Sequence, residues 1–212
     1  MRDRRNRRSR AWGLLVALAF ADPSPARAAA PVPSAPELRF ARGAQEWGFA
    51  AGHGFGLSVG GSDGSELGDL EFVALVPRLG IGLTDPLGEA GWWRGNLELL
   101  IEGALLFEHH PTGGFAGGGG LGLRYNFLGL ERAVPFVEGG AGILGLDFDL
   151  EHQSDGLNFG VQLGAGFHYG LSRRTALTVE WLFHHISNAG IHEHNDGIND
   201  ALFLVGVSYF PE

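Results

Sequence analysis

Alternation with a period of two residues runs through most of this chain and constrains its fold more than any other feature. In LNFGVQLGAGFHY, at 157–169, apolar side chains occupy every odd position, while glycine, asparagine, glutamine and histidine occupy the even positions. Successive side chains of a β-strand point to opposite faces, so the pattern predicts a strand with one apolar face. Similar alternation recurs at 96–105, 120–127 and 175–187. The chain is therefore predicted to be all-β.

Eight strands are predicted, joined by short segments rich in glycine, proline, aspartate and serine, which are typical turn residues. They span residues 45–59, 69–83, 94–107, 116–128, 134–148, 157–170, 175–188 and 201–210. Two architectures use strands of this kind. One is a soluble sandwich or lipocalin-like barrel with its apolar face inward, and the other is an outer-membrane barrel with its apolar face outward.

The second face of the predicted strands favours the membrane barrel. Besides many glycines it carries a few charged or polar residues, namely Arg78, Glu98, Glu102, Arg124, Glu138, Gln162, His168 and Glu180. A face in water normally has long charged side chains and few glycines, whereas the narrow lumen of a small barrel accommodates glycine beside charges that pair with one another. We therefore predict an eight-stranded antiparallel transmembrane β-barrel of the outer-membrane type. Its lumen charges should form a packing network without an open pore.

The first 28 residues have the composition of a secretory signal peptide. An arginine-rich segment precedes the apolar run AWGLLVALAFA, and Ala26-Arg27-Ala28 offers a small-x-small cleavage pattern. The apolar run is too short to span a bilayer as a helix. We expect residues 1–28 to be removed, residues 29–43 to form a flexible leader and residues 44–212 to form the barrel.

Composition and charge exclude several kinds of site and partner. The chain has no cysteine, which excludes disulfides and thiolate metal ligands. Its net charge of −9 becomes more negative once the arginine-rich segment is removed, so nucleic acid is not an expected partner. His109 and His110, like the group His192, Glu193 and His194, are expected in solvated extracellular loops. We accordingly predict no metal site.

The polar stretch HHISNAGIHEHNDGIND at 184–200 directly follows the apolar strand TALTVEWLF. An even-stranded barrel has both termini in the periplasm, so the end of the seventh strand should lie near the outer leaflet. His185 and Ser187 share the parity of the apolar residues and should face lipid, whereas His184 should face the lumen. Polar groups that face lipid tend to be functional, and histidine beside serine is the base–nucleophile pair of acyl-transfer hydrolases. The alternative is an ordinary polar strand end at the membrane interface.

At these residues the chain resembles the PagL-type lipid A 3-O-deacylases, a family of outer-membrane enzymes. The resemblance rests on His-x-Ser-Asn at 185–188, Asn-x-Gly at 195–197 and a last strand ending LVGVSYF. It implies cofactor-free hydrolysis of the ester-linked acyl chain at the 3-position of lipid A, a component of lipopolysaccharide. Ser187 would be the nucleophile and His185 the general base, while Asn188, Gly190 and Asn195 would support the site and its oxyanion.

Asn199 departs from the family's pattern, which commonly has a glutamate here to orient the histidine. An asparagine can accept a hydrogen bond from the imidazole, but it lacks the full charge that stabilises an imidazolium, so the resemblance implies a slower enzyme. Asp200 is the alternative orienting acid, and Glu193 is a more remote one.

Several functions and partners stay open beside the deacylase. They are a non-enzymatic small barrel with an adhesive or structural role, a catalytically weakened family member, and a lipid A palmitoyltransferase, which would add an acyl chain rather than remove one. Lipopolysaccharide and outer-membrane lipids are the expected partners, and a homodimer is left open.

Overall fold

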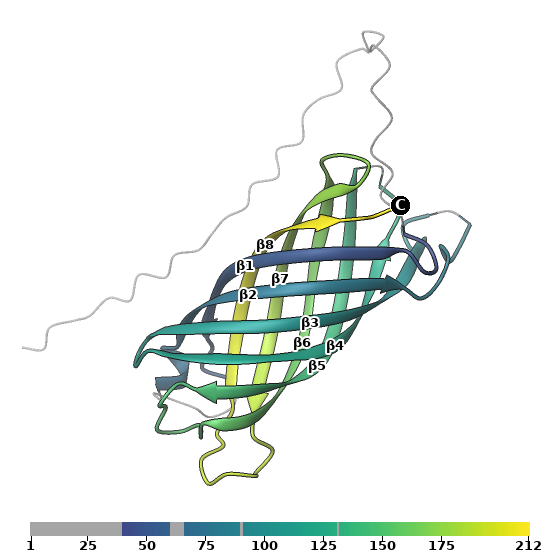
Figure 1. Ribbon diagram of the computed structural model, residues 1–212. Coiled ribbons are helices and arrows are strands. Elements are labelled where there is room, and N and C mark those ends of the chain that lie inside the picture. Colours follow the sequence, from purple (N-terminus) through teal and green to yellow (C-terminus); the bar gives the residue numbers. More distant parts are fainter. Residues whose placement is uncertain (1–39, 60–65, 90, 131) are drawn as a thin grey trace, which may run out of the picture. The chain divides into compact units, whose positions relative to one another are not determined.

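Eight antiparallel strands close into a barrel in the computed structural model, which describes residues 40–59, 66–89, 91–130 and 132–212. Each strand pairs with its neighbours along the chain, and β1 pairs with β8 (Figure 1). A short 3-10 turn, η1 (Glu66–Gly68), precedes β2. The strands are β1 (Gln45–Gly56), β2 (Glu71–Gly82), β3 (Gly95–His110), β4 (Gly114–Phe127), β5 (Ala133–Asp147), β6 (Gly156–Gly170), β7 (Thr175–Ser187) and β8 (Ile198–Tyr209). The predicted signal peptide and most of the leader lie outside the described residues.

The predicted fold class is confirmed, although three strand ends differ by three residues from the predicted bounds and several others differ by one or two. β8 begins at Ile198 rather than at residue 201, β3 continues to His110 rather than ending at 107, and β1 ends at Gly56 rather than at 59. Backbone pairing with a neighbouring strand, not side-chain polarity, decides where a strand ends. His109 and His110 therefore lie on a strand, and the prediction that they sit in a loop is wrong.

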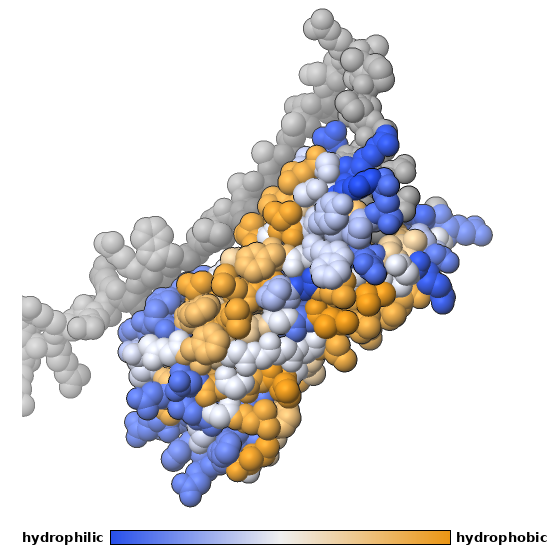
Figure 2. All heavy atoms as spheres, viewed as in Figure 1, coloured by the Kyte–Doolittle hydropathy of each residue, from blue (hydrophilic) through white to orange (hydrophobic). Residues whose placement is uncertain are grey.

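The outer surface of the barrel is apolar along its middle. Along all eight strands the odd-numbered residues face outward, and the buried residues fall at even positions except for Gly95 and Ala201. Figure 2 shows hydrophobic side chains over the middle of the visible face and hydrophilic ones towards its two ends. An apolar band between polar ends is the surface of a barrel that spans a bilayer. Among the described residues, no helix is long and apolar enough to cross a membrane.

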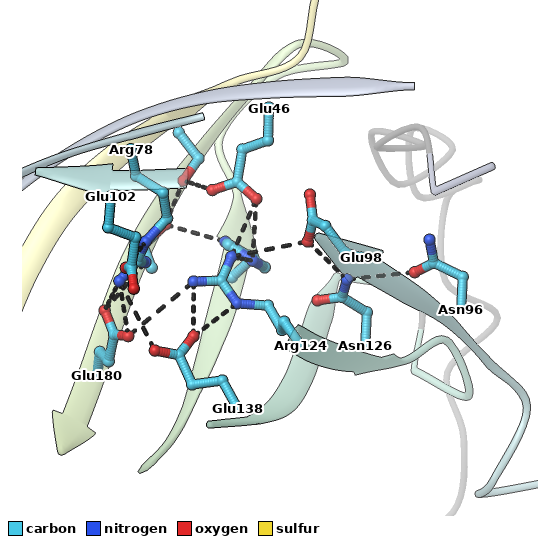
Figure 3. Close-up of polar contacts among 12 residues, drawn as sticks. Glu46, Arg78, Asn96, Glu98, Glu102, Arg124, Asn126, Glu138 and Glu180 are labelled. Carbon is cyan, nitrogen blue, oxygen red and sulfur yellow. Dashed lines mark hydrogen bonds and ion pairs between the residues drawn. The ribbon is translucent and has the colours of Figure 1, made fainter. Parts of the chain in front are cut away.

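A network of charges fills the middle of the lumen, as the sequence predicts (Figure 3). Arg124 lies 2.8 Å from Glu138 and 3.0 Å from Glu46, measured between guanidinium nitrogens and carboxylate oxygens. Arg78 makes the corresponding contacts with Glu102, at 2.5 Å, and with Glu180, at 3.0 Å. All of these groups are buried or nearly so, and the cavity beside Glu102 has a volume of only about 50 Å³.

Both ends of the folded chain meet at one end of the barrel. Phe40, at a position that the sequence assigns to the leader, is buried there, and its ring lies 5.3 Å from that of Phe210. The folded part therefore already includes Phe40. The loop that joins β7 to β8 lies at the opposite end of the barrel from the C-terminus (Figure 1).

Candidate active site

The end of β7 carries polar side chains alternately outward and inward. His185 and Ser187 lie half-buried on the outward face, whereas His184 and Ile186 point into the barrel and are buried. The alternation runs unbroken from the apolar part of the strand, because the pairing of β7 with β6 keeps one register along its whole length. This is the separation of the two histidines that strand parity predicts.

Asn199 lies directly across from His185 on β8. Side chains that are opposite each other in an antiparallel pair lie on the same face of the sheet, and here His185 Nδ1 and Asn199 Oδ1 are 2.8 Å apart. An amide oxygen only accepts hydrogen bonds, so His185 donates from Nδ1, and Nε2 is left as the unprotonated nitrogen. The Asn199 amide nitrogen lies 3.5 Å from the carbonyl oxygen of Val59, which agrees with this orientation of the amide.

The two alternative orienting acids are not next to His185. Asp200 points to the opposite face of β8, into the barrel, where its Oδ2 lies 3.4 Å from Nδ1 of His184. Glu193 is exposed in the loop and forms no hydrogen bond or ion pair with His185. Of the three candidates, the structure brings Asn199 to the imidazole.

Ser187 follows His185 by two positions on the same outward face. Two residues of strand separate their Cα atoms by roughly 7 Å. Among the described residues, the Ser187 hydroxyl has no hydrogen-bond partner, so the base and the hydroxyl form an open pair on the barrel's surface. Contacts between a nucleophile and its base often tighten only when substrate binds.

Asn188 holds the loop that follows β7. Its side chain is buried, with Oδ1 accepting a hydrogen bond from the Gly190 amide at 2.9 Å and Nδ2 donating to the His194 carbonyl at 2.8 Å. Its backbone amide donates to Oδ1 of Asn195 at 2.7 Å. Asn188 and Asn195 therefore keep the two arms of the loop in place.

Of the three backbone amides at positions 188–190, the amide of Ala189 has no hydrogen-bond partner among the described residues. The neighbouring amides of Asn188 and Gly190 both donate hydrogen bonds to side-chain oxygens within the loop. Ala189 has φ of 53° and Gly190 has φ of 78°, both left-handed, so the backbone turns sharply two residues after Ser187. A free amide two residues beyond a serine hydroxyl is a candidate oxyanion donor.

Two further residues position the imidazole from the side of the loop. Gly197 packs against the ring so closely that a Cβ there would lie 2.8 Å from His185 Cε1. Its amide donates to Oε1 of Gln153 at 3.0 Å, and the buried Gln153 in turn donates to Asn158 at 2.8 Å. The Asn-x-Gly string includes Gly197, but no sequence signal indicates Gln153, which is 44 residues away in the β5–β6 loop.

The loop histidines do not assemble a metal site with the residues that the structure describes. His192 and His194 are exposed, and neither belongs to a group of three possible ligands close enough to share an ion. The group that meets this condition is His53, Glu71 and His109, on the outer face of β1–β3.

A family model described as lipid A 3-O-deacylase (PagL) matches residues 78–208. The match covers more than half of the chain and includes His185, Ser187 and Asn199. The chain belongs to the PagL lipid A 3-O-deacylase family. The resemblance carried by the last two strands is thereby confirmed. Members of this family are ester hydrolases of lipid A, and the family and the closed barrel together indicate the outer membrane as the location of the chain.

Several solved outer-membrane barrels are similar to this chain. The crystal structure of the outer membrane enzyme PagL is 20% identical, covers 79% of this chain and 99% of its own, and has a TM-score of 0.46. The N-terminal β-barrel domain of OprF from Pseudomonas aeruginosa is 14% identical, covers 80% and 98% respectively, and has a TM-score of 0.50. Neisserial surface protein A is 15% identical, covers 78% and 96%, and has a TM-score of 0.49. No curated protein matches the chain.

Proposed function

We propose that this chain is a lipid A 3-O-deacylase that hydrolyses the ester of the 3-hydroxyacyl chain at the 3-position, with Ser187 as nucleophile and His185 as general base. The observation that carries the proposal is the 2.8 Å contact between His185 Nδ1 and Asn199 Oδ1. This contact leaves Nε2 free to accept a proton, on the same outward face as the Ser187 hydroxyl.

The reaction follows from these two side chains. His185 Nε2 takes the proton of the Ser187 hydroxyl while the serine oxygen attacks the carbonyl carbon of the ester. The bond between that carbon and the sugar oxygen then breaks, and the sugar oxygen takes the proton from the imidazolium. The acyl group stays on Ser187 until a water molecule, deprotonated by His185, attacks the same carbon. The bond between that carbon and the serine oxygen then breaks, the serine oxygen takes the proton back from the imidazolium, and the fatty acid is released. None of these steps requires a cofactor.

The loop after β7 supports the oxyanion in this mechanism. The Ala189 amide is unengaged among the described residues and lies two positions beyond Ser187, so it is the donor that we assign to the carbonyl oxygen. Asn188, Gly190 and Asn195 act through the loop that they order, since their hydrogen bonds hold the turn in shape. A preorganised donor is effective because it needs no rearrangement when charge develops.

We place the site at the outer leaflet, after removal of residues 1–28 on export. Both termini of an even-stranded barrel lie in the periplasm, and the β7–β8 loop lies at the opposite end of the barrel from the C-terminus (Figure 1). Beside the site on β6, Phe159 pairs with Ser187 and Val161 pairs with His185, and both are exposed outward. Their apolar surface suits the acyl chain of a lipid that approaches within the membrane plane.

Mass spectrometry of lipid A incubated with the detergent-solubilised protein tests the proposal. The wild type is expected to remove one ester-linked 3-hydroxyacyl chain, and His185→Ala is expected to remove none at a detectable rate. His192→Ala, which changes an exposed histidine in the adjacent loop, serves as the matched control and should keep the activity. A wild type that leaves lipid A unchanged, or that adds an acyl chain, contradicts the proposal.

Asn199→Asp should make the enzyme faster. Aspartate has the shape of asparagine and places a charged oxygen at the same position, 2.8 Å from His185 Nδ1. A hydrogen bond to a charged acceptor is stronger by about 1.4 kcal/mol than one to a neutral acceptor, which corresponds to roughly a tenfold gain in kcat at neutral pH. Asn199→Leu, which removes the acceptor at similar volume, should instead lower kcat. Steady-state kinetics in which both variants match the wild type would refute the orienting role of Asn199.

Gly197→Ala should lower kcat on the order of a hundredfold, because the new methyl group must displace the imidazole that it meets at 2.8 Å. Backbone strain is not the cause that we expect, and Gly113→Ala controls for it. Gly113 also has positive φ, but a Cβ there would meet nothing within 4 Å. Deacylation rates, measured beside gel mobility as a check of folding, should fall for Gly197→Ala alone. Equal losses in the two variants would refute the packing role of Gly197.

A further inference from the structure

We propose that His53, Glu71 and His109 form a Zn²⁺ site on the outer face of the barrel, at the end that carries the β7–β8 loop. The three side chains come from β1, β2 and β3, and their ligand atoms all lie within 4.8 Å of one another. The Nε2 atoms of His53 and His109 are 3.3 Å apart, and Glu71 Oε2 is 3.8 Å from His53 Nε2. The site is separate from the proposed catalytic residues and does not depend on their activity.

An irregularity in β3 brings His109 into this group. Phe72 pairs with Glu108 and Glu71 pairs with His110, so His109 is an extra residue without a partner of its own in the β2–β3 ladder. A β-bulge of this kind redirects a side chain and is frequent beside functional sites. Here the redirected imidazole reaches across β2 towards the imidazole of His53.

The distances between the ligand atoms fit a tetrahedral zinc ion. Zn–N bonds of about 2.0–2.1 Å at the tetrahedral angle separate two coordinating nitrogens by roughly 3.3–3.4 Å. The separation of the two Nε2 atoms is 3.3 Å. A small rotation of Glu71, whose side chain is 50% exposed, is enough to bring its oxygen from 3.8 Å to bonding geometry.

The donor set selects the class of metal. Two imidazoles and one carboxylate suit zinc or a similar transition metal, whereas Ca²⁺ and Mg²⁺ prefer oxygen ligands alone. Three protein ligands leave a fourth position open for water or for an anionic group of a neighbouring lipid. A bound ion would also link three adjacent strands at the rim of the barrel.

The setting of the three residues gives a physical reason for the site. His53 on β1 pairs with Phe203 on β8, and the ring of Phe203 stacks on that of Phe55 with 6.1 Å between the ring centroids. His53 therefore projects from an outward face rich in aromatic side chains, where unsatisfied polar groups are costly. Coordination of one cation satisfies both imidazoles and the carboxylate together.

Two metal titrations of the detergent-solubilised protein, prepared without an affinity tag, test the inference. Zn²⁺ binding is measured by calorimetry, and Co²⁺ serves as a spectroscopic substitute whose binding is followed by absorption. We expect one ion per barrel, an intense visible Co²⁺ spectrum typical of tetrahedral coordination, and weaker binding as the pH falls from 7.5 to 5.5, because protons compete for the imidazoles. An ordinary hydrogen bond between the two histidines would give neither the spectrum nor the binding.

Variants decide whether these three residues hold the ion. His109→Ala and the conservative Glu71→Gln should each weaken Zn²⁺ binding by at least about tenfold. His192→Ala, in the β7–β8 loop, should leave the binding unchanged. Gel mobility with and without heating shows that each variant is folded, and Glu71→Gln keeps the test valid if His109→Ala fails to fold. The inference would be overturned if the wild type binds no Zn²⁺, or if His109→Ala and Glu71→Gln both bind Zn²⁺ as tightly as the wild type does.

Discussion

Ser187→Ala is expected to lower the rate of lipid A deacylation by at least about 10³-fold, because the variant has no hydroxyl to attack the ester. The alanine removes one oxygen from a half-buried position on the outward face, where the hydroxyl makes no hydrogen bond with the described residues. The barrel should therefore fold normally. The measurement is the initial rate of loss of the 3-hydroxyacyl chain, followed by mass spectrometry.

Ser172→Ala is the matched control for this experiment. Ser172 lies in the β6–β7 turn at the opposite end of the barrel, and its hydroxyl accepts a hydrogen bond from the Arg174 amide. The control should keep the wild-type rate. If Ser187→Ala keeps that rate as well, Ser187 is not the nucleophile, and His185 would have to activate a different nucleophile.

Arg124→Met is expected to destabilise the barrel by about 3–5 kcal/mol. Arg124 is fully buried, with Glu46 and Glu138 at 3.0 and 2.8 Å and with the Phe136 ring 4.2 Å below its guanidinium (Figure 3). Methionine fills part of the volume but leaves buried Glu46 without its arginine partner and leaves Glu138 only the longer contact with Arg78, at 3.7 Å. The midpoint of urea unfolding in detergent, followed by tryptophan fluorescence, measures the loss.

A second substitution separates lost charge pairing from lost packing. Adding Glu138→Gln to Arg124→Met removes one of the two carboxylates that lose Arg124 and should recover part of the stability, because a neutral amide costs less to bury than a charge. Arg173→Met, at an exposed position in the β6–β7 turn, should be nearly silent. If the double variant is no more stable than Arg124→Met, the charge network is not the main contribution of Arg124.

The number of strands and the direction of their faces could be predicted from the sequence, because strand parity is a local property. Alternation along β6 and β7 identifies the residues that point outward, and it separates His185 from His184 before any partner strand is known. The ends of the strands are harder to predict from the sequence, because pairing with a neighbouring strand determines them. Residues 198–200 follow a polar loop sequence and include Asn199 and Asp200, so they look like part of the loop, yet they pair with 184–186 and extend β8.

The candidate active site was predictable where its residues are close in sequence. His185, Ser187 and Asn188 lie in one short motif, and their relation follows from two-residue spacing. The partner of His185 did not follow in this way, since Asn199 and Asp200 are adjacent and point to opposite faces. A shift of one residue in the β7–β8 register would exchange them, so only the observed register selects Asn199.

The sequence alone predicts a barrel with an apolar exterior and a charged lumen, with a histidine and a serine on its outer face. These properties depend on periodicity and composition, which are local. The three-dimensional structure was needed to show that Asn199 lies 2.8 Å from His185, that Gly197 packs against the imidazole and is held by Gln153, and that His53, Glu71 and His109 meet at the rim. Each of these contacts joins residues from different strands or loops, and its existence depends on register, on a bulge or on the approach of two loops, none of which periodicity specifies.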